Sequence, residues 1–197
     1  IVLCCEGVIS FYYVWVNGKL LGYNQGSKTA AEWDITDVLN EGENVVALEV
    51  YRWSAGAYLE CQDMWRLSGI ERDVYLYSQP KAALKDFRIT STLDDSYKNG
   101  VFALNVDLRN HRPAATNLTL AYELLDAQGK VVATEEKTTY VPVNETRTLS
   151  FDKNLTDVHT WTSEHPNLYK LVMTVKEEGK VNEIIPFNVG FRRIEIK

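Results

Sequence analysis

Seven short runs of alternating apolar and polar residues fill the second half of the chain, and this rhythm constrains the fold more than any other feature. Segments such as "DDSYKNG", "DAQG" and "EEGK" separate the runs and are rich in residues that favour tight turns. Alternation with a period of two is typical of strands buried on one face. The runs cover residues 84–91, 100–110, 117–127, 130–141, 145–155, 167–177 and 184–193. Seven such strands in about 110 residues predict an immunoglobulin-like β-sandwich.

The first half contains the dipeptide Asn17-Gly18 between two aromatic-rich runs, "FYYVWV" and "KLLGY". This is the strongest short hairpin signal, because both residues tolerate positive φ, and it predicts a type I′ hairpin over residues 11–23. A further strand is expected over residues 44–53. Its consecutive apolar positions from Val45 to Leu48 predict a central strand covered on both faces.

Pro80 interrupts the strand pattern, and the composition changes there. Four of the five tryptophans precede it, and only Trp161 follows. We therefore expect a boundary between two all-β domains near residues 79–81, which gives domains of residues 1–79 and 80–197.

Composition excludes several classes of function. The net charge of −6 and the pI near 5.2 argue against nucleic acid as a partner, since phosphate binding needs clustered Lys and Arg. No apolar run reaches the roughly 20 residues of a membrane-spanning helix. Cys4, Cys5 and Cys61 show no metal-binding spacing, and we expect all three to be reduced. No phosphate-binding glycine motif or nucleophile elbow occurs.

The two ends of the sequence suggest a piece of a larger protein. The chain starts without Met in an apolar run and stops soon after another run that reads as a strand. No signal segment is visible. For a bacterial protein, both the cytoplasm and the periplasm therefore stay open as compartments.

Residues 52–76, "RWSAGAYLECQDMWRLSGIERDVYL", mix aromatic and charged residues in a way that neither a strand nor a solvated loop explains. Glu60 and Asp63 could in principle lie at the separation of about 5 to 9.5 Å that glycoside hydrolysis requires. Arg66, Arg72 and Lys19 could equally neutralise them. On the residues alone, a structural charge cluster is favoured over a catalytic pair.

This stretch resembles the β-galactosidases of glycoside hydrolase family 2, whose pattern reads R-W-S-x-G-S-Y-L-E-x-Q-D-M-W-R-x-S-G-I-x-R-D-V. Upstream, "VWVNGKLLGYNQGSKTAAEWDIT" is similar to the end of that family's sugar-binding jelly-roll domain. Downstream, "WTSEHPNLYKLVM" and "VGFRRIEI" are similar to the immunoglobulin-like domain that precedes the catalytic barrel. The implied fold is all-β, with a partial jelly-roll sandwich over residues 1–79 and an immunoglobulin-like sandwich over residues 80–197.

The resemblance implies the non-catalytic N-terminal region of a retaining β-galactosidase that acts on terminal non-reducing β-D-galactosides. The two catalytic glutamates would belong to a barrel after Lys197, so this chain would hold no catalytic residue and would be inactive alone. Asp63 is the residue expected to reach the barrel mouth, where it would bind a galactose hydroxyl and a sodium ion. The residues expected to support its loop are Trp53, Tyr58, Glu60, Trp65, Arg66 and Arg72.

Two departures from the family pattern bear on metal sites. Ala55 stands where the best-known members carry an Asp that helps to hold magnesium, whereas Gln25 matches another residue of that site. We therefore expect the magnesium site to be weak or absent. Cys61 replaces an acid close to Asp63, which lowers the local negative charge available to sodium.

Two alternatives remain at this point. The chain could be a carbohydrate-binding module, or a structural spacer of another family 2 glycosidase of the β-glucuronidase or β-mannosidase type. A jelly roll that lacks its opening strands should also leave an apolar strand edge near residues 1–6 or Trp15 unpaired. Pairing of that edge with a second copy would make the protein a homo-oligomer.

Overall fold

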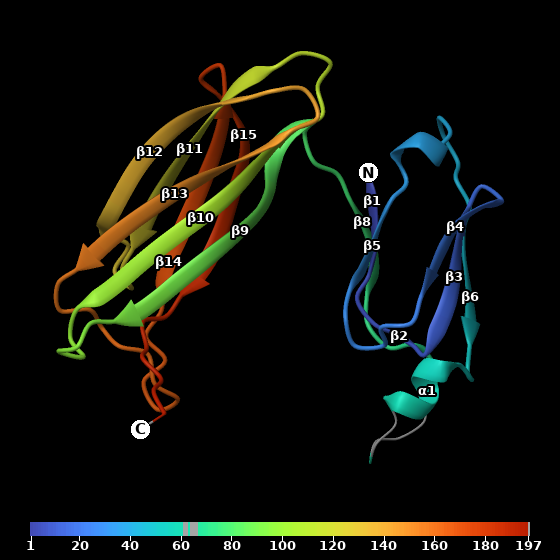
Figure 1. The fold of residues 1–197 in the computed structure, drawn as a ribbon, viewed down its shortest axis with the longest axis horizontal. Helices are drawn as coiled ribbons and strands as arrows, with labels where there is room; N and C mark the ends of the chain where they lie inside the picture. The colour runs from blue at the N-terminus through green and yellow to red at the C-terminus, as the bar shows by residue number, and fades with distance from the viewer. Residues whose placement is uncertain (61–62, 64–66, 197) are drawn as a thin grey trace. The chain divides into compact units, whose positions relative to one another are not determined.

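The computed structural model describes residues 1–60, 63 and 67–196, and its regular secondary structure is almost entirely β-strand (Figure 1). It divides into two compact units, Ile1–Gln79 and Pro80–Lys197. Among the described residues, no helix combines the length and the apolar character needed to cross a membrane.

Unit 1 contains two antiparallel three-stranded sheets and a short third pairing. The sheets have the orders β5-β1-β8 and β4-β3-β6, and β2 pairs with β7. The 3-10 helix η1 (Thr36–Val38) follows β5, and helix α1 (Ala55–Leu59) follows β6. The strands are β1 (Val2–Cys5), β2 (Val8–Ile9), β3 (Phe11–Val16), β4 (Lys19–Asn24), β5 (Ala31–Asp34), β6 (Val46–Tyr51), β7 (Gly69–Ile70) and β8 (Val74–Tyr77).

The core of unit 1 forms because β3 alternates strictly along its length. Tyr12, Val14 and Val16 are buried, and they pack in one cluster with Leu3 and Cys5 of β1. The residues between them on β3 point to the opposite face of the sheet, as the period of two requires. Each sheet therefore contributes one face to the sandwich.

Besides this shared core, the two sheets are in contact at the edge strands β4 and β5. Trp33 of β5 packs directly on Gly22 of β4, so these two strands lie against each other. Leu76 of the edge strand β8 pairs with the buried Leu3 of β1, yet Leu76 is 56% exposed. Apolar side chains on the inner face are thus well covered near β4 and β5 and less covered at β8.

The predicted hairpin is confirmed. Asn17 and Gly18 have φ values of 51° and 78°, and a type I′ turn requires positive φ at both central positions. The Asn17 side chain also donates to the backbone oxygen of Val38 at 2.8 Å. The hairpin is thereby tied to the last residue of η1.

Two predictions about strand edges are wrong. Strand β6 is an edge strand and is not covered on both faces, and Val45 just before it is 63% exposed. Conversely, β1 lies between β5 and β8, and Trp15 lies on β3 between β4 and β6, so neither region is an unpaired edge. An apolar run indicates that a strand can be buried. It does not indicate whether the strand is central or at an edge, because the neighbouring strands come from segments distant in sequence.

Unit 2 has the predicted immunoglobulin-like character, with seven strands in two sheets of orders β13-β10-β9 and β12-β11-β14-β15. All pairs within these sheets are antiparallel. The strands are β9 (Ala82–Leu93), β10 (Gly100–Asn110), β11 (Thr116–Leu125), β12 (Val131–Val141), β13 (Thr146–Leu155), β14 (Tyr169–Glu177) and β15 (Lys180–Val189).

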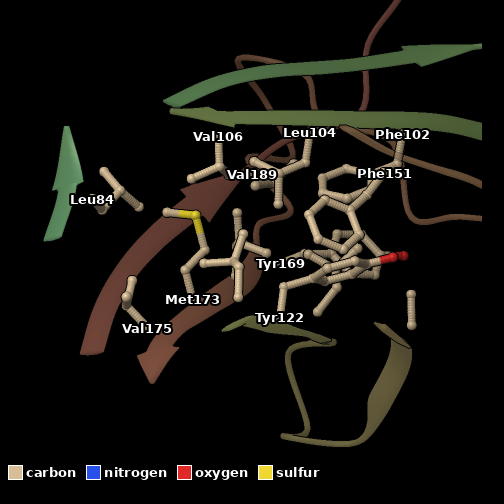
Figure 2. Close-up of a cluster of buried hydrophobic side chains, with 14 of the residues drawn as sticks. Leu84, Phe102, Leu104, Val106, Tyr122, Phe151, Tyr169, Met173, Val175 and Val189 are labelled. Atoms are coloured by element: carbon tan, nitrogen blue, oxygen red, sulfur yellow. The ribbon is translucent and has the colours of Figure 1, made fainter. Parts of the chain in front are cut away.

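The core of unit 2 lies between its two sheets (Figure 2). Tyr122 of β11 contacts Phe102 of β10 and Phe151 of β13, with ring centroids 5.6 and 5.3 Å apart. Burial raises the pKa of the Tyr122 hydroxyl. Met173 and Val189 extend the same cluster. This aromatic and aliphatic packing stabilises the sandwich without an inter-sheet disulfide, since the half contains no cysteine.

Cys4 and Cys5 are free and buried, as predicted, whereas Cys61 lies outside the described residues. Burial raises the pKa of the Cys5 thiol. A hydrogen bond with Cys4 raises the pKa of Tyr75, on the neighbouring strand β8, to about 12. Both cysteines therefore act as small structural residues of β1.

Candidate functional site

Helix α1 begins at a capped position fixed to the core of unit 1. The Ser54 hydroxyl accepts a hydrogen bond from the Ala57 backbone N–H at 3.3 Å, which is the usual role of an N-cap serine. The same oxygen lies 2.9 Å from the hydroxyl of Ser10, which is fully buried. Gly56 packs against the backbone oxygens of Gln25 and Ser10, where a side chain would have ordinary contact only. The start of α1 is thus held in place by buried groups.

The end of α1 is tied to the loop that follows β4. The Glu60 backbone N–H donates to the Gly56 oxygen at 2.8 Å, and its carboxylate accepts from the Ser27 backbone N–H at 3.4 Å. The next residue of that loop, Lys28, forms an ion pair with Glu71. One loop therefore contacts both the chain before Asp63 and the chain after it.

Arg72 supports the same region through its backbone and its aliphatic stem. Its N–H donates to the Gly7 oxygen at 3.4 Å, and the Glu71 N–H donates to that oxygen at 3.0 Å. A Cβ at Gly7 would lie 3.1 Å from the Cγ and Cδ of Arg72, so the stem lies close over this glycine. These contacts fix the chain beside the β2–β7 pairing.

Asp63 lies in a turn after α1 and is exposed. Trp53 and Tyr58 contact each other with ring centroids 6.3 Å apart, yet they are 52% and 69% exposed. The guanidinium of Arg52 lies 5.3 Å from the Trp53 ring centroid. Predicted support residues Trp65 and Arg66 lie outside the described residues. The supporting role of the two exposed rings stays a prediction.

The described residues can supply only part of a metal site. They contain no group of three or more His, Cys, Asp or Glu side chains placed to hold a metal ion. The Asp63 carboxylate offers hard oxygen suited to sodium, and further ligands would have to come from elsewhere. Magnesium does not fit the residues present. The Gln25 backbone oxygen lies beside Gly56 of α1, but the Ala55 methyl group offers no oxygen.

Sequence reasoning missed four residues of this site: Ser10, Ser27, Lys28 and Ser54. Ser54 could have been found, because serine directly before a helix start is a common cap. The Lys28 and Glu71 pair is 43 residues apart in sequence, and no local pattern joins them.

Two models of known protein families match the chain and show which family it belongs to. Residues 1–80 match the model described as Glycosyl hydrolases family 2, sugar binding domain, and residues 82–192 match Glycosyl hydrolases family 2. The chain belongs to glycosyl hydrolase family 2. This membership agrees with the resemblance carried by residues 52–76.

Curated relatives and solved structures extend this family 2 assignment. The chain is 44% identical over 194 residues to a β-galactosidase of Priestia megaterium and 40% identical over 193 residues to one of Clostridium acetobutylicum. These matches cover 98% of this chain but only 19% and 20% of the relatives, so the chain spans about a fifth of their length. Its fold resembles a Bacteroides uniformis β-glucuronidase, with TM-score 0.89, 21% identity, and 96% of this chain and 24% of that chain covered. A putative β-galactosidase of Bacteroides fragilis gives TM-score 0.84 at 25% identity, with 99% and 30% covered.

Proposed function

We propose that this family 2 chain is the non-catalytic N-terminal region of a retaining β-galactosidase that hydrolyses terminal non-reducing β-D-galactosides. The observation that carries the proposal is the 44% identity to a β-galactosidase along 98% of the chain. The likeness to β-glucuronidases is 20–23% identical and supports the fold alone.

Within this proposal, Asp63 is the side chain that the region presents to substrate. It is exposed, and it follows a helix fixed at both ends, by Ser54 at the start and by Glu60 at the end. A functional carboxylate needs such a rigid support to keep its position. An ionised carboxylate accepts hydrogen bonds from sugar hydroxyls and supplies an oxygen ligand to sodium. The remaining ligands and both catalytic carboxyl groups would belong to the catalytic barrel of the parent enzyme.

The alternative is a binding or spacer region of a β-glucuronidase or β-mannosidase. The full-length parent separates these possibilities when its hydrolysis of chromogenic β-galactoside, β-glucuronide and β-mannoside is compared at equal concentration. We expect the highest kcat/KM for the β-galactoside. A parent that prefers the β-glucuronide or β-mannoside would contradict the proposal. The 197-residue chain assayed alone is expected to hydrolyse none of them.

We also propose that the parent is a homo-oligomer. The edge strands β6 and β8 of this chain support this, because apolar residues such as Val46 and Leu76 are exposed there and edge strands favour pairing. Analytical ultracentrifugation of the parent across a range of concentrations tests it. A monomer at every concentration would contradict the proposal.

A further inference from the structure

The outer face of the β4-β3-β6 sheet in unit 1 carries a group of aromatic side chains that the proposed function does not use (Figure 1). Because β3 alternates about its buried positions, its outward residues are Phe11, Tyr13 and Trp15. Residues paired with these three point to the same side of the sheet. They complete this surface, which we call the aromatic face, with Leu20 and Tyr23 from β4 and Ala47, Glu49 and Tyr51 from β6. The aromatic face therefore extends across all three strands.

The rings of the aromatic face hold one another in place while part of their surface stays exposed. Phe11 and Tyr23 stack with ring centroids 5.4 Å apart, and Tyr13 meets Phe11 edge to face at 4.9 Å. Tyr23 is nevertheless 57% exposed, and Leu20 is 51% exposed. Contiguous apolar patches of several hundred Å² are uncommon on soluble monomers and mark interaction sites. The aromatic face thus has the character of a surface that another protein surface covers.

The size of the aromatic face indicates which kind of partner it fits. Each of its three strands has six residues, so at about 3.3 Å per residue and about 4.8 Å between strands the face covers roughly 20 by 14 Å, or about 300 Å². Even doubled for the relief of the side chains, this area is below the roughly 800 Å² per partner that stable complexes of separate chains bury. Interfaces between domains of one chain begin at about 600 Å² in total, or roughly 300 Å² per side. A tethered domain also meets its partner at a high effective concentration, so a small contact is sufficient.

The charge of the aromatic face defines the chemistry of this partner. Of its eight residues, all of which the structure describes, only Glu49 is charged. The Tyr51 hydroxyl donates to Glu49 Oε1 at 2.8 Å. A carboxylate has about four acceptor positions, so Glu49 can accept from further donors. Because a carboxylate that loses its water in an interface needs a charged partner, a covering surface should place a Lys or Arg opposite Glu49.

The shape of the aromatic face adds a second requirement. Ala47 is the residue opposite Trp15 on β6, and its small side chain leaves space beside the indole. The resulting hollow has a volume of about 390 Å³, and its lining is formed by Trp15, Gly18, Val45, Ala47, Leu48 and Glu49. Five of these six residues are uncharged and offer mainly carbon surface. An apolar side chain of the covering surface therefore fits into the hollow.

We propose that the aromatic face is an interface between domains of the full-length parent, covered by a further domain of the same polypeptide. That domain inserts an apolar side chain beside Trp15 and pairs a Lys or Arg with Glu49. The inference rests on the proposed function in one respect, namely that a longer parent exists. A curated relative of which this chain covers 19% is about five times as long, so a parent of that length has ample surface outside residues 1–197. The nature of the substrate plays no part in the inference.

Photo-crosslinking in the full-length parent tests the proposal. Tyr23→p-benzoylphenylalanine places a photoreactive ring on the aromatic face, and the same change at Tyr140, an exposed residue of unit 2, measures the background. After irradiation, we expect a product that migrates as one chain on a denaturing gel and contains a link from position 23 to a peptide outside residues 1–197. A product with the mass of two chains would assign the face to a second copy and overturn the proposal. A yield at position 23 no greater than that at position 140 would also overturn it.

Hydrogen exchange at the amides of β4 provides an independent measurement. Covering the aromatic face should slow this exchange by about tenfold or more in the parent relative to the 197-residue chain. Ala47→Arg fills the hollow, and Glu49→Gln removes the charge while it keeps the shape. Both changes should accelerate exchange in the parent and leave the 197-residue chain unaffected. Equal exchange in the parent and the 197-residue chain, or equal effects of the two changes in both, would contradict the proposal.

Hydrolysis of a chromogenic β-galactoside by the same parent preparation separates this inference from the proposed function. A parent that hydrolyses the β-galactoside but forms no link within one chain overturns the inference alone. A parent that forms the link but prefers another glycoside overturns the proposed substrate alone and leaves the interface in place.

Discussion

Trp33 packs on Gly22 so closely that a Cβ on the glycine would come within 2.8 Å of the indole Cζ3 atom. This contact joins β5 of one sheet to β4 of the other in unit 1. Trp33 also packs against the buried core cluster that contains Val14 and Leu3. The absence of a side chain at position 22 therefore sets how closely the two sheets approach at this edge.

Gly22→Ala should destabilise unit 1 by about 1–3 kcal/mol, because a methyl group added to packed surroundings forces a rigid ring to shift. Denaturant unfolding measures the loss. Trp33→Leu removes the ring, so it should cost less in the Gly22→Ala background than in the wild type. Additive effects in this double-mutant cycle would contradict the assigned contact.

Ser54→Ala should loosen helix α1 and cost about 1 kcal/mol, because the Ala57 N–H loses its capping acceptor and the buried Ser10 loses a partner. Hydrogen exchange at the amides of residues 57–60 measures the effect locally. Ser54→Thr keeps the hydroxyl and should exchange at nearly the wild-type rate. Equal protection in Ser54→Ala and the wild type would show that the cap does not hold the helix.

Asp94 should make the stability of unit 2 depend on pH at acid values. Hydrogen bonds from Ser96 and then Asn99 lower the pKa of its carboxyl group to about 2, from an ordinary value of about 3.9. The folded state thus favours the ionised form. Its contribution is present above pH 3.9 and disappears as the pH falls toward 2.

Asp94→Ala should therefore lower the melting temperature at pH 7, and the difference from the wild type should shrink between about pH 4 and pH 2. The exposed Glu164, changed to alanine, is the matched control and should show little difference at either pH. A difference for Asp94→Ala that stays constant down to pH 2 would contradict the assigned hydrogen bonds.

Local patterns predicted much of the fold. Asn17-Gly18 specified the hairpin because its two positive φ values suit few other residues, and the seven alternating runs of unit 2 each became a strand. The pairing of β1 with β5 and β8 could not be read in this way. The partner strands of β1 lie some 30 and 70 residues away in sequence. Likewise, the apolar residues from Val45 to Leu48 do not indicate which strands lie beside them.

In the candidate site, too, the sequence indicated some residues, whereas their contacts could be found only in the folded structure. Glu60, Asp63 and Arg72 stood out in the sequence because charged residues crowd among aromatics there. The contacts of Glu60 with Ser27 and of Glu71 with Lys28 depend on a loop from another part of the chain. Only the fold brings these segments together.

We propose that Asp63 belongs to the substrate site of the full-length parent, which we propose to be a β-galactosidase. The most direct test compares Asp63→Ala with wild type in the full-length parent, on a chromogenic β-galactoside, with and without sodium. Asp37→Ala, a change of another exposed aspartate in unit 1, is the control. We predict that Asp63→Ala lowers kcat/KM by around a hundredfold or more, on the order of 2.7 kcal/mol, and abolishes sodium dependence. A rate and a sodium response equal to those of wild type would contradict the claim and leave the segment around Asp63 a structural one.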